Sequence, residues 1–175
     1  QASASIWATL RRAAKLEPGI ICTMLEGERV YSEVQAMAPM FDDVVIDCRG
    51  SADKGLLSAL KGANRGLTPV WPGEFDRQSM FNMVELVGMA RVVNPELKAI
   101  ATINRALTND RDFDARRTQE ILRRDIPDYQ LVDGIIHGRK AWNHCAESGT
   151  SVMEHKPLDK EAVVELEHLA REVWA

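Results

Sequence analysis

Residues 98–104, KAIATIN, form a short apolar run that lies between two segments with helical spacing. Similar runs occur at residues 19–25, 43–48, 66–71 and 131–136, and four of the five carry Ile or Val at two or more positions, as buried strands do. Amphipathic segments precede, separate and follow them, at roughly 3–16, 29–39, 53–63, 76–92, 112–125, 139–149 and 159–174. This alternation predicts an α/β fold: a mostly parallel sheet with helices on both faces.

Length and composition limit the possible functions. The chain has 175 residues, which predicts a single domain over 1–175, and 45% are hydrophobic, which excludes intrinsic disorder. The net charge is −4, so any contact with nucleic acid has to be a local basic patch. No apolar stretch is long enough to span a bilayer and no signal peptide opens the chain, so we expect a cytoplasmic protein without a membrane partner.

Parallel α/β sheets bind ligands outside the carboxyl ends of their strands, so the residues that follow each run are the candidate site. Asp47 ends the run 43–48 and Gly50 follows it, a pattern by which nucleoside triphosphatases hold Mg²⁺ and sense a γ-phosphate. The alternative is an Asp that caps the next turn or helix. Asn104 ends the run 98–104, where its amide suits a base edge but is also a common turn residue. Pro69 inside the run 66–71 predicts an edge strand or an irregular strand end.

Several motifs follow one another in a specific order. They are Gln1-Ala2-Ser3-Ala4-Ser5-Ile6-Trp7, Asp47 to Gly50, SALKGANRGLTPVWPGEFD (58–76), Asn104-Arg105, and Arg139 to Trp142 with Gly149 to Glu154. In this order they resemble the ParA/MinD family of deviant-Walker P-loop ATPases, above all the small ParA-type partition ATPases, over nearly the whole chain. Asn64 stands where that family usually has Asp, and Gly73-Glu74 where Ser-Pro is typical.

One departure concerns the phosphate-binding loop of that family, KGGxGKT, which the 175 residues do not contain. The Asp-x-Asp-Pro that precedes Gln1 in the family is absent too. Because the chain starts without Met and inside a motif, we expect a fragment that lacks an amino-terminal βα unit, whose strand is central in the family. The alternative is a remnant that never binds ATP.

The resemblance implies a Mg²⁺-dependent ATPase that binds ATP or ADP between two protomers of a homodimer. Asp47 would order the Mg²⁺ shell through water, and Asp47 and Gln1 would be the catalytic residues. Together with Gln1, Ser3 and Gly50 would contact the γ-phosphate. At the other end of the nucleotide, Asn104, Arg105 and His137 would lie at the adenine. For His137 the alternative is a surface loop histidine.

The same resemblance implies DNA partition as the function. ATP-bound dimers of the family bind DNA without sequence preference in the nucleoid, and a centromere-binding partner protein stimulates hydrolysis. In this chain Arg116, Arg117, Arg123 and Arg124 recur seven residues apart in pairs, which would align four guanidinium groups for phosphate contact. The alternative is a solvated helix face, since Glu120 and Asp125 lie nearby.

Two other functions remain open from the sequence. One is a non-catalytic ParA-like module that binds DNA or a protein. The other is a positioning ATPase of the MinD type or a metabolic ATPase of the same superfamily. The carboxyl end, LDKEAVVELEHLAREVWA, is more acidic than basic, which disfavours the basic membrane helix that a MinD-like protein would need.

Overall fold

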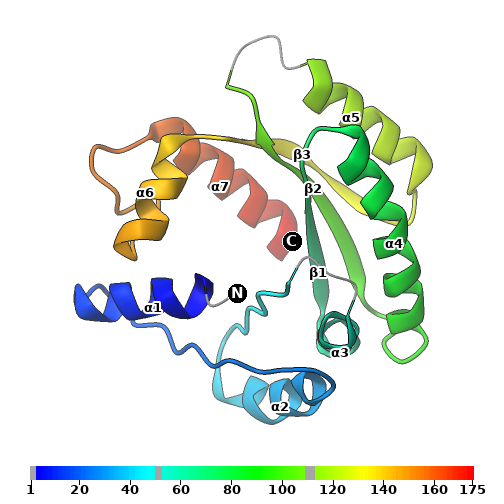
Figure 1. The fold of residues 1–175 in the computed structure, drawn as a ribbon, viewed down its shortest axis with the longest axis horizontal. Helices are drawn as coiled ribbons and strands as arrows, with labels where there is room; N and C mark the ends of the chain where they lie inside the picture. The colour runs from blue at the N-terminus through cyan, green and yellow to red at the C-terminus, as the bar shows by residue number, and fades with distance from the viewer. Residues whose placement is uncertain (1–2, 50–52, 109–112) are drawn as a thin grey trace.

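The computed structural model describes residues 3–49, 53–108 and 113–175. Its centre is a three-stranded sheet in the order β1-β2-β3, formed by Arg65–Val70, Lys98–Ala106 and Gln130–His137. Both strand pairs are parallel, with Val70 opposite Ile103 and Ala106 opposite His137 (Figure 1). The predicted α/β fold with a parallel sheet is therefore confirmed, and so are the strands expected at 66–71, 98–104 and 131–136.

Helices cover both faces of this sheet, as the sequence predicts (Figure 1). On one face α3 (Lys54–Gly62), α4 (Glu74–Arg91) and α5 (Phe113–Asp125) pack over an apolar core that includes Met80, Ile103 and Leu122. On the other face α7 (Lys160–Trp174) packs on β3, where Ile100 and Val132 meet Val173.

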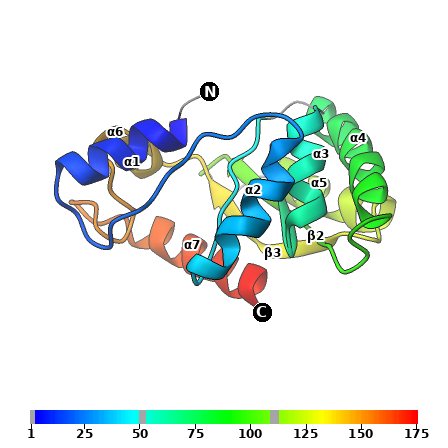
Figure 2. The ribbon, with the colours of Figure 1, turned by 90° about the horizontal axis from the view of Figure 1, so that it is seen from below.

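Three helices lie outside these two layers. They are α1 (Ser3–Ala13), α2 (Arg29–Met37) with the 3₁₀ turn Ala38–Met40, and α6 (Lys140–Ser148). Figures 1 and 2 show α1 beside α6 at one end of the molecule, and α2 next to α3. The hydroxyl of Ser58 in α3 anchors α2, because it accepts from the amide of Tyr31 and donates to the carbonyl of Glu28, both at 2.9 Å.

The first strand, β1, lies at an edge of the sheet. Its inner side pairs with β2, and no strand of the described residues pairs with its outer side. Pro69 is tolerated there because its missing N–H removes no hydrogen bond that an edge strand needs. The prediction from Pro69 is therefore confirmed. Leu67, on the same strand, keeps 40% of its surface exposed.

Two expected strands are wrong, those at 19–25 and 43–48, since both segments lack regular secondary structure. The second one does alternate: Val44, Ile46 and Cys48 pack against the apolar cluster of α2 and α3, whereas Val45 is 79% exposed. The alternation of apolar residues in this segment therefore predicts correctly which side chains are buried. A strand also needs a hydrogen-bonded neighbour, and within the described residues neither segment has one.

Candidate functional site

The carboxyl ends of the three parallel strands bring four candidate side chains to one edge of the sheet. They are Trp71 after β1, Asn104 and Arg105 in β2, and His137 at the end of β3. The guanidinium carbon of Arg105 lies 5.9 Å from the centre of the Trp71 ring. The amide of Gly138 donates to the carbonyl of Ala106 at 2.9 Å, which ties the ends of β2 and β3 together.

The end of β2 is irregular at Arg105. Its φ of 58° lies in the left-handed region, which is uncommon for a residue with a side chain. The register of β2 against β3 shifts between Ile103 and Ala106, and the Asn104 carboxamide oxygen accepts from the Arg105 amide at 3.0 Å. Such strained positions cluster at functional sites, where the surrounding structure holds them in place. At this irregular position the Arg105 side chain lies beside the Trp71 ring.

His137 is held by a half-buried charge cluster. Its Nδ1 lies 2.7 Å from a carboxylate oxygen of Glu165, and its backbone amide donates to the other oxygen at 3.1 Å. Arg139 donates to Glu165 from Nε and Nη2, and to Glu161 from Nη1. These bonds to Glu165, more than those to Glu161, raise the pKa of the Arg139 guanidinium. With Nδ1 on Glu165, the Nε2 atom of His137 is the ring nitrogen left for a ligand.

The remaining nucleotide-site candidates lie on other elements. Asp47 is exposed in the extended segment 43–48, and Ser3 is exposed at the start of α1. In the part of the chain that the structure describes, no hydrogen bond or ion pair joins either of them to the Trp71, Arg105 and His137 group. Gln1 and Gly50 lie outside the described residues.

The exposed carboxylate of Asp47 is compatible with Mg²⁺, which retains several water ligands when it binds to a protein. Within residues 3–49, 53–108 and 113–175, no group of three or more His, Cys, Asp or Glu residues is placed to hold an ion. Mg²⁺ differs from Zn²⁺ in this respect, because it retains several waters and takes one or two carboxylates together with substrate phosphates. An exposed carboxylate such as Asp47 fits that mode of binding.

The four arginines of α5 are not equivalent. The helix buries Ala115, Thr118, Gln119 and Leu122, so all four arginines face solvent. Arg123 is paired with Asp133 of β3, and Arg124 with its neighbour Asp125. Arg116 and Arg117 have no such carboxylate partner among the described residues. The expected stripe of four positive charges is therefore reduced to two unpaired ones.

No sequence pattern indicates the residues that support this site. Glu165 lies 28 residues from His137, and a Glu on an acidic helix looks like any solvated charge. The motif that contains Arg139 does not indicate its partners Glu161 and Glu165. Helical spacing places Glu161 and Glu165 on one face of α7, yet only the packing of α7 on β3 shows what that face meets.

No protein-family model matches the chain. The chain is similar to the maintenance of carboxysome distribution protein A of Halothiobacillus neapolitanus, with 27% identity over 137 residues. The match covers 77% of this chain and 61% of that protein, so the chain spans less than two thirds of the relative's length. No described helix is long and apolar enough to cross a membrane. The distant, partial similarity supports a ParA/MinD type of protein and no finer assignment.

Proposed function

We propose that the chain forms part of a ParA-like ATPase that positions a cargo inside the cell, with DNA partition as its specific task. The observation that carries the proposal is the group of Trp71, Arg105 and His137 at the carboxyl ends of parallel strands, where α/β folds bind their ligands. The similarity to a protein named for carboxysome distribution supports a positioning role. It also favours, as a second candidate, a cargo other than DNA.

Two groups of residues would hold the nucleotide. Asn104, Arg105 and the free Nε2 atom of His137 would bind the adenine end. Asp47 would order the water around Mg²⁺, and Gln1, Ser3 and Gly50 would contact the γ-phosphate. When bound, Mg²⁺ neutralises charge on the phosphate oxygens, and hydrolysis then depends on the positioning of the attacking water.

The 175 residues contain no KGGxGKT loop, so the proposed ATPase requires a phosphate-binding loop that this sequence does not supply. The outer edge of β1, with the exposed side of Leu67, offers a place for one more strand and helix, although Pro69 would leave one position of that pairing without a backbone donor. Segment 43–48 packs on the same helix as β1, because α3 shares one apolar cluster with β1, which includes Leu60 and Val70, and another with the segment, which includes Ala59 and Ile46.

A homodimer that encloses the nucleotide would bind duplex DNA through Arg116 and Arg117. Their guanidinium groups are exposed and have no carboxylate partner among the described residues, whereas Arg123 and Arg124 already have one. A centromere-binding partner would stimulate hydrolysis and release the dimer. The protein would then act in the cytoplasm, on the nucleoid.

Binding to non-specific duplex DNA, measured with and without Mg·ATP, tests the proposal on the protein expressed from its full reading frame. We expect binding that requires ATP and disappears in Asp47→Ala. Arg116→Ala and Arg117→Ala should each reduce the salt-dependence slope by about 1, because each removes one phosphate contact. Arg123→Ala is the matched control and should have a smaller effect, since Asp133 already neutralises that side chain.

The other outcomes separate the alternatives. DNA binding that ignores both ATP and Asp47→Ala would indicate a non-catalytic interaction module. ATP hydrolysis without any DNA binding would favour positioning of a cargo other than DNA. Absence of both activities would contradict the proposed function.

A further inference from the structure

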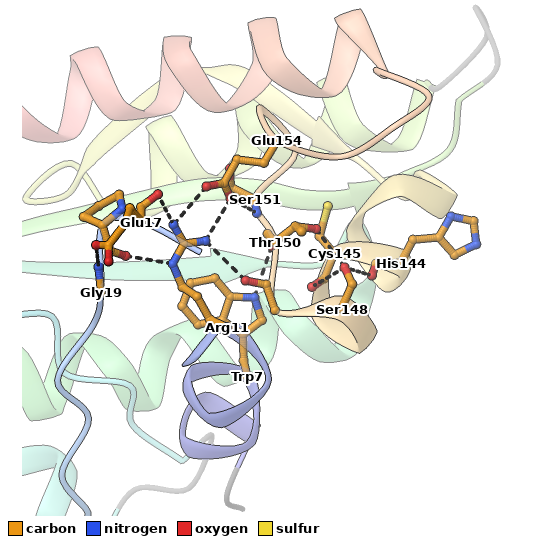
Figure 3. A network of polar contacts seen from close by, with 12 residues as sticks. Trp7, Arg11, Glu17, Gly19, His144, Cys145, Ser148, Thr150, Ser151 and Glu154 are labelled. Carbon is orange, nitrogen blue, oxygen red and sulfur yellow. Dashed lines mark hydrogen bonds and ion pairs between the residues drawn. The ribbon is translucent and has the colours of Figure 1, made fainter. Parts of the chain in front are cut away.

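A second charge network lies away from this site, around Arg11 of α1 (Figure 3). The Arg11 side chain is only 5% exposed, and Glu154 accepts from its Nη1 and Nη2 at 2.9 Å each. Its other three N–H groups donate to the carbonyls of Pro18, Glu17 and Gly149, at 2.9, 2.8 and 3.3 Å. All five donors of the guanidinium are therefore used.

These polar contacts attach α1 to the loop that follows α6. The indole N–H of Trp7 donates to the carbonyl of Thr150 at 3.1 Å. Gly149 has a φ of 72°, and a Cβ at this residue would lie 2.3 Å from the backbone nitrogen of Arg11. Ala8 and Arg11 are the buried residues of α1, so apolar burial contributes little to its attachment.

The hydrogen bonds to Glu154 in this loop stabilise its ionised form. Besides its two bonds from Arg11, it accepts from the Ser151 amide at 2.7 Å. The bonds from Arg11, followed by the Ser151 amide, lower the pKa of Glu154 to about 2. The pair is therefore fully ionised at neutral pH. Replacement of Arg11 would leave a half-buried carboxylate without its cation.

The loop after α6 leads back to His137. The indole N–H of Trp142, in the first turn of α6, donates to the His137 carbonyl at 2.9 Å, and Arg139 holds the same turn on α7 through Glu161 and Glu165. Hydrogen bonds therefore join α1 to the loop 149–154, and they also join α6, which directly precedes this loop in the chain, to His137. Ser3 lies at one end of these connected elements and the candidate base site at the other.

We infer that Arg11 is a positioning residue that couples the amino-terminal end of α1 to the His137 end of the site. This inference rests on the proposed function, in which Ser3 and His137 contact opposite ends of one nucleotide. Contact with a ligand at one end then shifts α1 and α6 together, and the other end follows. Lysine cannot replace Arg11, because a single ammonium group cannot reach five acceptors arranged around a planar fork.

Hydrogen exchange on the full-reading-frame protein without nucleotide tests the coupling itself. Arg11→Met keeps an apolar stem of similar length and removes every charge-assisted bond. We expect amides of 3–13, 137–142 and 149–154 to lose protection together, by about tenfold, whereas those of β2 stay unchanged. Arg12→Met, the exposed neighbour on the same helix, is the matched control and should change none of them. Loss of protection confined to α1, or no loss at all, would overturn the coupling.

ATP turnover provides the second readout. Arg11→Met and Arg11→Lys should raise the KM for ATP by about tenfold, a usual size for a coupling between two sites, with a smaller change in kcat. An unchanged KM in both variants would overturn the positioning role even if exchange shows that the elements are coupled. If the unaltered protein binds no ATP, the proposed function fails, while the exchange experiment still decides whether α1 and α6 move as one unit.

Discussion

The sheet and the corner formed by α1, α6 and the loop 149–154 are held by different forces. In the sheet, Ile103 and Ala101 are completely buried and Val70 keeps 2% of its surface exposed, all among apolar neighbours. In the corner, the buried residues of α1 are Ala8 and the charged Arg11, and five hydrogen bonds hold the Arg11 guanidinium. Apolar burial is non-directional and stabilises the fold, whereas a buried ion pair fixes one geometry. The difference indicates that the sheet contributes most of the stability, whereas the ion pair in the corner fixes the position of α1 relative to the loop 149–154.

Ile103→Ala should have the largest effect, because it removes a fully buried side chain between β2 and the helices α4 and α5. We expect a loss of about 4 kcal/mol in the free energy of unfolding, from lost transfer and a cavity. Urea denaturation followed by circular dichroism measures it. Strand and helix signals should be lost in one transition, and a loss under 1 kcal/mol would show that the sheet is not the stability centre.

Gly149→Ala should break the corner and spare the sheet. The added Cβ would clash with the backbone of Arg11, and Gly149 itself has a positive φ that disfavours a side chain. We therefore expect the free energy of unfolding to fall by about 3 kcal/mol and α1 to detach from the loop. Hydrogen exchange by residue should show lost protection in α1 and normal protection in β2. Gly88→Ala is the control on α4, where a Cβ meets nothing within 4 Å, and it should gain about 0.5 kcal/mol. Equal effects of the two changes would contradict this contrast.

Acid should loosen the corner before the sheet. The pKa of Glu154 is lowered from 4.5 to about 2 in the folded protein, so its stabilising contribution is complete above pH 4.5 and is lost as the pH falls toward 2. Glu154→Gln should cost about 1.5 kcal/mol at neutral pH and abolish the Glu154 part of this pH dependence. Protection of α1 amides measured from pH 5 to pH 2.5 checks it. If Glu154→Gln keeps the full pH dependence of amide protection in α1, that dependence comes from another titratable group.

Apart from the control Gly88→Ala, Thr102→Val should have the smallest effect, and it should stabilise the protein. Thr102 is 2% exposed in β2, and its hydroxyl has no hydrogen-bond partner among the described residues. A methyl group of the same shape removes that unpaired polar atom, so we expect a gain of about 1 kcal/mol in the free energy of unfolding. A loss instead, measured by urea denaturation, would show that the hydroxyl has a partner in solution.

The sequence predicts what depends on local periodicity. The strands at 66–71, 98–104 and 131–136 and the helices between them form as expected, because each follows from the spacing of its own apolar residues. Segments 19–25 and 43–48 have the same kind of pattern, but a strand also requires a neighbour that local spacing cannot supply.

The candidate site divides in the same way. The positions of Asn104, Arg105 and His137 at strand ends follow from the rule for parallel sheets. Their supporting contacts do not, since Arg11 and Glu154 lie 143 residues apart and His137 and Glu165 lie 28 apart. Only the packing of α1 against the loop 149–154 and of α7 against β3 reveals these pairs.

Calorimetric titration of Mg·ATP into the full-reading-frame protein, beside Asp47→Ala and His137→Ala, would test directly whether the ends of these strands bind a nucleotide. We predict saturable binding that needs Mg²⁺ and is weakened about tenfold or more in each variant, because one loses the phosphate end of the site and the other the base end. No binding by the unaltered protein, or affinity that both substitutions leave unchanged, would contradict a nucleotide site at this edge of the sheet.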